Sequence, residues 1–123
     1  MPYQVYKVLH IFGVIMLFVS LGGLTLHALN GGTKDSNTNR KWVGISHGVA
    51  MIVILVAGFG LLARLQMMQA ALPLWVWLKL GVWVVMGGMV AIPYRKPELA
   101  RPLWLLLPVM GAIAAAIAIY KPA

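Results

Sequence analysis

Four long apolar runs, separated by short polar stretches, make up most of the chain. The first extends from Val5 to Leu29, and the others cover residues 42–63, 74–92 and 103–120. A helix rises about 1.5 Å per residue, so roughly 20 apolar residues cross the hydrocarbon layer of a bilayer. The pattern therefore predicts four transmembrane helices. Because every connection is short, they should form an up-down-up-down bundle, a single all-α domain over residues 1–123.

The connections between these runs differ in character. Residues 30–39 and 93–102 are polar loops at one end of the predicted bundle. The stretch from Arg64 to Leu72 mixes glutamine with apolar residues and is predicted to lie along the membrane interface, before a helix that begins at Pro73. Pro93 is predicted to end the third span. Pro108 is predicted to bend the fourth, because a proline removes one helical hydrogen-bond donor.

Composition narrows the function classes. The chain is 62% hydrophobic and 10% charged, which excludes an ordinary soluble domain. It has no cysteine, so disulfides and thiolate metal sites are excluded, and two acidic residues leave little scope for paired-carboxylate catalysis. The formal charge is +8, but the basic residues flank the apolar runs. The predicted partner is therefore the lipid bilayer and not nucleic acid.

Basic residues also predict an orientation. Most of them lie in the two loops opposite the chain ends: Lys34, Arg40, Lys41, Arg95, Lys96 and Arg101. Cytoplasmic loops carry an excess of lysine and arginine, so both termini are predicted to be outside the cytoplasm of a cell membrane, taken to be a bacterial inner membrane. The first run lacks the basic leader and cleavage site of a signal peptide, so it is expected to remain in the mature protein.

Small residues recur at helical spacing on each predicted span. The repeats are Gly13, Ser20 and His27 on the first, Gly44, Gly48 and Gly58 on the second, Gly81 and Gly88 on the third, and Gly111, Ala115 and Ala118 on the fourth. Helices approach closely in lipid where side chains are small. The repeats therefore predict a tight bundle, a homo-oligomer or a membrane-protein partner.

Four ionisable residues lie at membrane depth, where they are costly and often functional. His10 and Lys79 should share one depth. His10 could ligate a haem iron, and Lys79 could be a second ligand, a propionate partner or a proton donor. Alternatively, His10 bonds a backbone carbonyl and Lys79 extends to the headgroups. If Gly81 faces the bundle, Lys79 faces lipid. His27 and His47 form a second pair near the other side, either as haem ligands or as groups that satisfy helix ends.

A family resemblance rests on two segments. Lys7-Val8-Leu9-His10-Ile11, with Gly13-Val14-Ile15 and Gly22-Gly23 following, resembles the first helix of small four-span proteins of the SirB, HemJ and CopD types. Trp77-Leu78-Lys79-Leu80 is similar to the start of their third helix. The HemJ type implies a protoporphyrinogen oxidase with haem b at residues matching His10 and Lys79. The CopD type implies copper handling, and the SirB type implies no settled activity.

The chain departs from the HemJ pattern by its shorter length and by Gly22-Gly23 and Thr25 in place of an aromatic and Pro-Arg segment. Whether it is an enzyme is left open. The sequence therefore leads to three hypotheses: haem b ligated through His10 in a redox-accessory protein, a non-catalytic scaffold or oligomer, and copper handling. The last would use His10 with Met16, Met51, Met86 and Met89.

Overall fold

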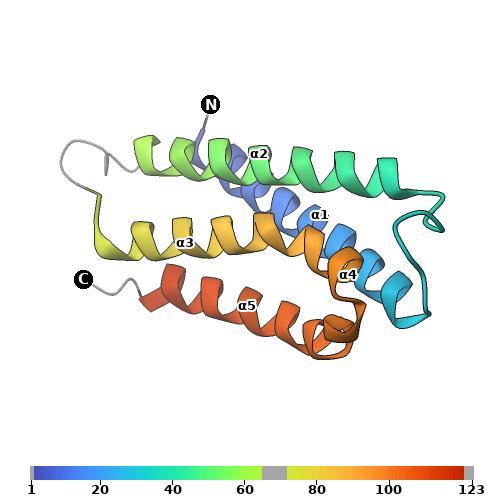
Figure 1. Ribbon diagram of the computed structural model, residues 1–123. Coiled ribbons are helices and arrows are strands. Elements are labelled where there is room, and N and C mark those ends of the chain that lie inside the picture. The colour runs from blue at the N-terminus through green and yellow to red at the C-terminus, as the bar shows by residue number, and fades with distance from the viewer. Residues whose placement is uncertain (1, 65–71, 121–123) are drawn as a thin grey trace.

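The structure, a computed structural model, describes residues 2–64 and 72–120 and is helical almost throughout. The long helices are α1 (Tyr3–Leu29), α2 (Arg40–Arg64), α3 (Leu74–Gly88) and α5 (Ala100–Tyr120). Between the last two lie the short helices η1 (Met89–Ala91), α4 (Ile92–Arg95) and η2 (Pro97–Leu99). Figure 1 shows the long helices side by side in one bundle, with successive helices running in opposite directions.

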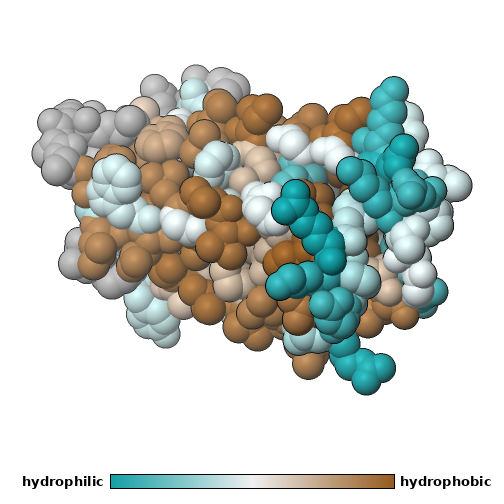
Figure 2. All heavy atoms as spheres, in the orientation of Figure 1, coloured by the Kyte–Doolittle hydropathy of each residue, from teal (hydrophilic) through white to brown (hydrophobic). Residues whose placement is uncertain are grey.

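Four segments are long and apolar enough to cross a membrane, which confirms the predicted spans. They are Gln4–Leu29, Arg40–Ala63, Leu74–Arg95 and Pro97–Tyr120. Large apolar side chains point outward along them, including Val19, Ile52 and Leu105, each more than 60% exposed. Such a surface is stable in lipid and not in water, so the chain is a multi-pass membrane protein. Figure 2 shows the apolar surface ending in a polar band at the loop end.

The first helix is the centre of the bundle. It packs along α2 and also contacts α5 and α4, whereas α2 and α3 approach each other at few points. Gly13 allows α1 to lie close to α2, because a Cβ atom at this position would lie 2.9 Å from Cγ1 of Ile54 on α2. Gly111 on α5 does the same against the ring of Phe18. These two glycines agree with the prediction of close packing at small residues, whereas Gly44 and Gly48 on α2 have no neighbour within 4 Å of an added Cβ atom.

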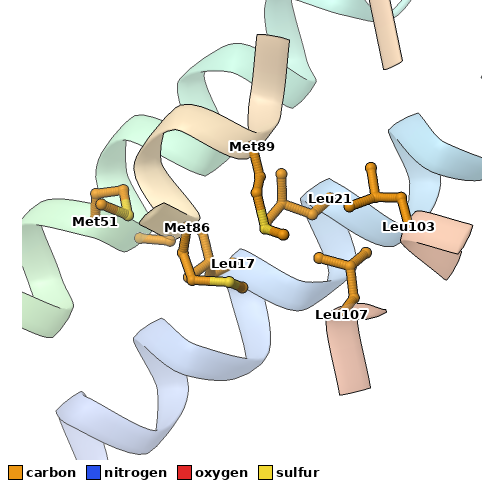
Figure 3. Close-up of a cluster of buried hydrophobic side chains, with 8 residues drawn as sticks. Leu17, Leu21, Met51, Met86, Met89, Leu103 and Leu107 are labelled. Carbon is orange, nitrogen blue, oxygen red and sulfur yellow. The ribbon is translucent and has the colours of Figure 1, made fainter. Parts of the chain in front are cut away.

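A core of leucine and methionine side chains joins all four spans (Figure 3). Each buried member leaves at most 9% of its surface exposed, and the set comprises Leu17, Leu21, Ala50, Met51, Met86, Met89, Leu103 and Leu107. Flexible methionine side chains fill irregular space between helices that cross at different angles. Packing thus accounts for Met51, Met86 and Met89, three of the four methionines in the copper-handling hypothesis.

The polar side chains in the middle of α1 are satisfied within the helix. The Ser20 hydroxyl donates to the carbonyl of Met16 at 2.9 Å, and the Thr25 hydroxyl donates to the carbonyl of Leu21 at 2.7 Å. Both bonds join a hydroxyl to the carbonyl four residues earlier, a common arrangement in helices. These two residues therefore require no partner from another helix.

The third span continues beyond Pro93, where the sequence predicted its end. The α-helix ends at Gly88, one 3-10 turn follows, and Pro93 lies in the first turn of α4. A proline fits the first turn of a helix because the amide there has no intrahelical partner. Helical structure therefore extends to Arg95. Pro108 lies inside α5, which is continuous through it.

The predicted interfacial segment from Arg64 to Leu72 lies for the most part outside the described residues. The start of the following helix is as predicted, with Pro73 directly before Leu74.

Candidate functional site

His10 faces the second helix from the inner side of α1. It shares this side with Gly13 and Leu17, three and seven residues further on, and is half-buried. Its Nδ1 atom lies 3.0 Å from the carbonyl oxygen of Ile54 on α2. A carbonyl only accepts hydrogen bonds, so Nδ1 carries the hydrogen and the neutral ring keeps a lone pair on Nε2.

Gly58 of α2 makes room for this imidazole. A Cβ atom at this position would lie 3.3 Å from Cε1 and 3.4 Å from Nδ1 of His10. Residues 54 and 58 are one turn apart, so one face of α2 supplies both the hydrogen-bond acceptor and the space. The glycine was predicted to pack a neighbouring helix, and here the group it packs against is the histidine ring.

Lys79 lies on the side of α3 that faces the bundle. It shares this side with Val76, Trp83 and Met86, at helical spacing, and is half-buried. Among the described residues it has no hydrogen-bond or ion-pair partner. The structure thus places both residues of the first predicted pair on the inward sides of their helices.

The predicted packing face of the third helix is wrong. Gly81 and Gly88 are exposed, and a Cβ atom at either position would have no neighbour within 4 Å. Gly87 faces inward instead, since a Cβ atom added at this position would lie 2.8 Å from Cε of Met51. The helix is therefore rotated so that Lys79 faces protein, opposite to the orientation that an inward Gly81 would have given.

His27 is bound to the loop that follows its own helix. Its Nε2 atom lies 2.8 Å from the carbonyl oxygen of Thr33 and 3.4 Å from the hydroxyl oxygen of Ser36. Gly32 packs directly on the ring. These contacts fit the alternative in which the residue satisfies backbone groups near a helix end.

His47 is the most buried of the three histidines, with 7% of its surface exposed. Its Nε2 atom lies 3.3 Å from the carbonyl oxygen of Met86, so this imidazole joins α2 to α3. His27 and His47 thus bond to different parts of the protein. The contacts of the described residues do not join them into one site.

Other candidate chemistry is absent from the described part of the chain. No group of three or more histidine or acidic side chains gathers there as a metal would require. Two open hollows lie on the outer surface, one of about 270 Å³ lined by Phe18, Trp104 and Pro108, the other of about 220 Å³ lined by Tyr6, Leu9 and Ile52. Neither is lined by His10 or Lys79.

Two contacts that hold the site in place were not predicted from the sequence. The indole Nε1 of Trp83 donates to the carbonyl of Met51 at 3.0 Å, which fixes α3 against α2 one turn beyond Lys79. The other is the Ile54 carbonyl that binds His10. Every residue carries a backbone carbonyl, so the sequence holds no signal for this one.

No protein-family model, curated protein or solved structure matches this chain.

Proposed function

We propose that this membrane protein ligates haem b through Nε2 of His10 and has a redox-accessory role in a bacterial inner membrane. The observation that carries the proposal is the hydrogen bond between Nδ1 of His10 and the Ile54 carbonyl. Histidines that ligate metals commonly donate their second ring nitrogen to a carbonyl or carboxylate, which fixes the tautomer and raises ligand basicity. His10 has this arrangement.

The donor set around His10 fits such a group. Lys79 supplies a positive charge at membrane depth, and the two acidic residues of the protein, Asp35 and Glu98, are exposed in the distant loops. A cation without an acidic neighbour attracts an anionic group such as a propionate.

Haem would supply one-electron redox chemistry, with a potential set by ligand identity, hydrogen bonding and burial. The residues of this chain would set those conditions. The Ile54 carbonyl orients the imidazole, Gly58 leaves room for it against α2, and Lys79 would hold a propionate by its charge. A ligand near the terminal end of the bundle would lie within reach of a redox partner outside that leaflet.

The visible spectrum of protein purified from a haem-replete host tests the proposal. We expect a Soret band that His10→Ala abolishes and that Lys79→Met weakens or shifts. His27→Ala is the matched control, since its imidazole is bound to a loop at the other end of the bundle. A colourless wild-type protein, or a Soret band unchanged by His10→Ala, contradicts the proposal.

A second candidate function is a non-catalytic oligomeric scaffold, which the outward glycines favour. Gly44 and Gly48 on α2, with Gly81 and Gly88 on α3, have open space where a side chain would be. Paired small residues four apart are common at helix contacts in lipid.

Light scattering in detergent distinguishes the two candidates. A scaffold gives a colourless, metal-free oligomer that Gly44→Leu dissociates, while Ile52→Leu, an exposed position on the same helix, leaves it intact. A monomer, or an oligomer that Gly44→Leu does not change, contradicts this second candidate.

A further inference from the structure

Basic side chains cluster at the end of the bundle where α1 joins α2 and α4 leads to α5. All six are exposed, and we call them the basic face: Lys34, Arg40, Lys41, Arg95, Lys96 and Arg101. Figure 2 shows a hydrophilic band that borders the apolar surface at this end of the molecule. The six residues come from two loops that are far apart in the sequence. The fold therefore concentrates on one face six of the ten basic residues of the protein.

The acidic residues nearby do not neutralise this face. Asp35 pairs with Arg40 at 3.4 Å, but the Asp35 side chain is 99% exposed, and such an ion pair is weak in water. The other five cations form no ion pair among the described residues. The basic face therefore keeps an excess of positive charge, even with Glu98 on the same end of the molecule.

A hydrogen bond holds the two loops together. The side-chain amide of Asn37 donates to the hydroxyl oxygen of Tyr94 at 2.9 Å, across 57 positions in the sequence. The first loop is also ordered by contacts between Thr33 and Ser36. The cations of the two loops are thus kept on a common surface despite their mutual repulsion.

The positions of these cations within the helices are electrostatically unfavourable. Arg40 and Lys41 begin α2, Arg101 is the second residue of α5, and neither helix has an acidic residue in its first turn. The amino end of a helix carries partial positive charge and favours anions. An anionic layer against this face would relieve both the repulsion between the cations and their conflict with the helix dipoles.

We propose that the basic face binds the headgroups of acidic phospholipids in the surrounding bilayer. The cations directly adjoin the ends of membrane-spanning helices, which places them at headgroup depth. Basic residues close to a membrane surface bind anionic lipids by charge attraction. Headgroup phosphates are present around the whole bundle, whereas a soluble anion has no apolar part to hold it beside the spans. This proposal is independent of haem binding.

Thermal unfolding in nanodiscs of defined composition tests it. We expect the wild type to have a Tm several degrees higher in discs with 30% phosphatidylglycerol than in pure phosphatidylcholine, because a ligand of the native state raises Tm. Arg95→Gln/Lys96→Gln/Arg101→Gln should lose most of this difference. In pure phosphatidylcholine the same variant should be as stable as the wild type, or more so, since repulsion is removed.

Two single substitutions keep the test decisive if the triple variant does not fold. Glu98→Gln removes an acidic group from this end and should enlarge the phosphatidylglycerol effect, whereas Arg95→Gln should reduce it. Lys7→Gln, an exposed cation at the opposite end, is the matched control and should change it less than Arg95→Gln.

The proposal fails under any of three outcomes. Equal Tm values for the wild type in the two kinds of disc would show no preference for acidic lipid. An equal effect of Lys7→Gln and Arg95→Gln would indicate a response to net charge and not a basic face. The third outcome is that inorganic phosphate raises the Tm in phosphatidylcholine discs as much as phosphatidylglycerol does. That result would identify the ligand of the basic face as a soluble anion and not a lipid.

Discussion

His10 on the first helix and Ile54 on the second are joined by a hydrogen bond of 3.0 Å from Nδ1 to the backbone oxygen. His27 and His47 bond to carbonyls through the other ring nitrogen, Nε2. The three histidines are therefore divided between two tautomers by the acceptors that the fold presents. His10 alone keeps its lone pair on Nε2, the nitrogen further from the backbone.

The division between tautomers is measurable by nitrogen NMR of histidine-labelled protein without haem, at alkaline pH where imidazoles are neutral. We expect the His10 signals to report hydrogen on Nδ1, and those of His27 and His47 to report hydrogen on Nε2. His10→Gln assigns the signals by removing one set. A His10 signal with hydrogen on Nε2 would refute the arrangement on which haem ligation rests.

Gly13→Ala should destabilise the bundle by about 1–3 kcal/mol, the usual cost of overpacking. The added methyl group would lie 2.9 Å from the Ile54 side chain and 3.2 Å from its backbone nitrogen. Gly44→Ala is the matched control, because open space surrounds that position and alanine favours a helix by up to about 1 kcal/mol. Unfolding by SDS in mixed micelles measures both. Equal effects of the two substitutions would contradict the packing of α1 on α2.

Trp83→Phe should reduce stability by about 0.6–2 kcal/mol, the range found for hydrogen bonds between helices in membranes. The substitution keeps an aromatic ring and removes the donor to the Met51 carbonyl. Trp77→Phe provides the comparison, since that side chain is 58% exposed and has no hydrogen bond to the described residues. The same micelle titration should give a smaller effect at Trp77, and a larger one there would contradict the contact between α2 and α3.

Tyr94→Phe should loosen the two loops that carry the basic face, since it removes the hydroxyl that accepts from Asn37. Amide hydrogen exchange in residues 30–39 measures this loosening, and we expect it to be faster. A double-mutant cycle with Asn37→Ala should give a coupling of about 1 kcal/mol, the usual net value of one hydrogen bond. Additive effects of the two substitutions would exclude the bond between the loops.

Lys79→Met should stabilise the protein without haem by up to about 2 kcal/mol, because a cation at membrane depth without a partner is costly. The same substitution should weaken haem binding, measured by titration of the Soret band. A gain in stability joined to a loss of affinity would identify Lys79 as a binding residue, whereas a loss of both would indicate a structural role.

The spans and the depths of their polar residues were predictable because both follow from counting along a helix. An apolar run of sufficient length gives a span, and the distance of His10 and Lys79 from the ends of their runs places them at one level. The rotation of α3 about its own axis was not predictable. Helices in lipid are apolar on every side, so the pattern of apolar positions does not identify the inward face.

The positions of the glycines do not predict the rotation of α3 either. Gly81, Gly87 and Gly88 occupy different sides of one helix, and the sequence does not say which of them contacts Met51. The end of the third span was misplaced for a related reason. The sequence predicts that Pro93 ends the span. In the structure one 3-10 turn precedes it, and the proline lies in the first turn of a new helix, where an amide hydrogen has no intrahelical partner to lose.

The internal bonding of α1 bears on the order in which the protein is assembled. Ser20 and Thr25 are satisfied by their own helix, so α1, which precedes the other three spans, incurs no penalty for them before those spans reach the lipid. His10 is the exception, and its acceptor is on the very next segment to be synthesised. The acceptors for the serine, threonine and histidine side chains of α1 up to Thr25 thus lie within the first two spans, whereas His47 of α2 finds its acceptor, the Met86 carbonyl, only on α3.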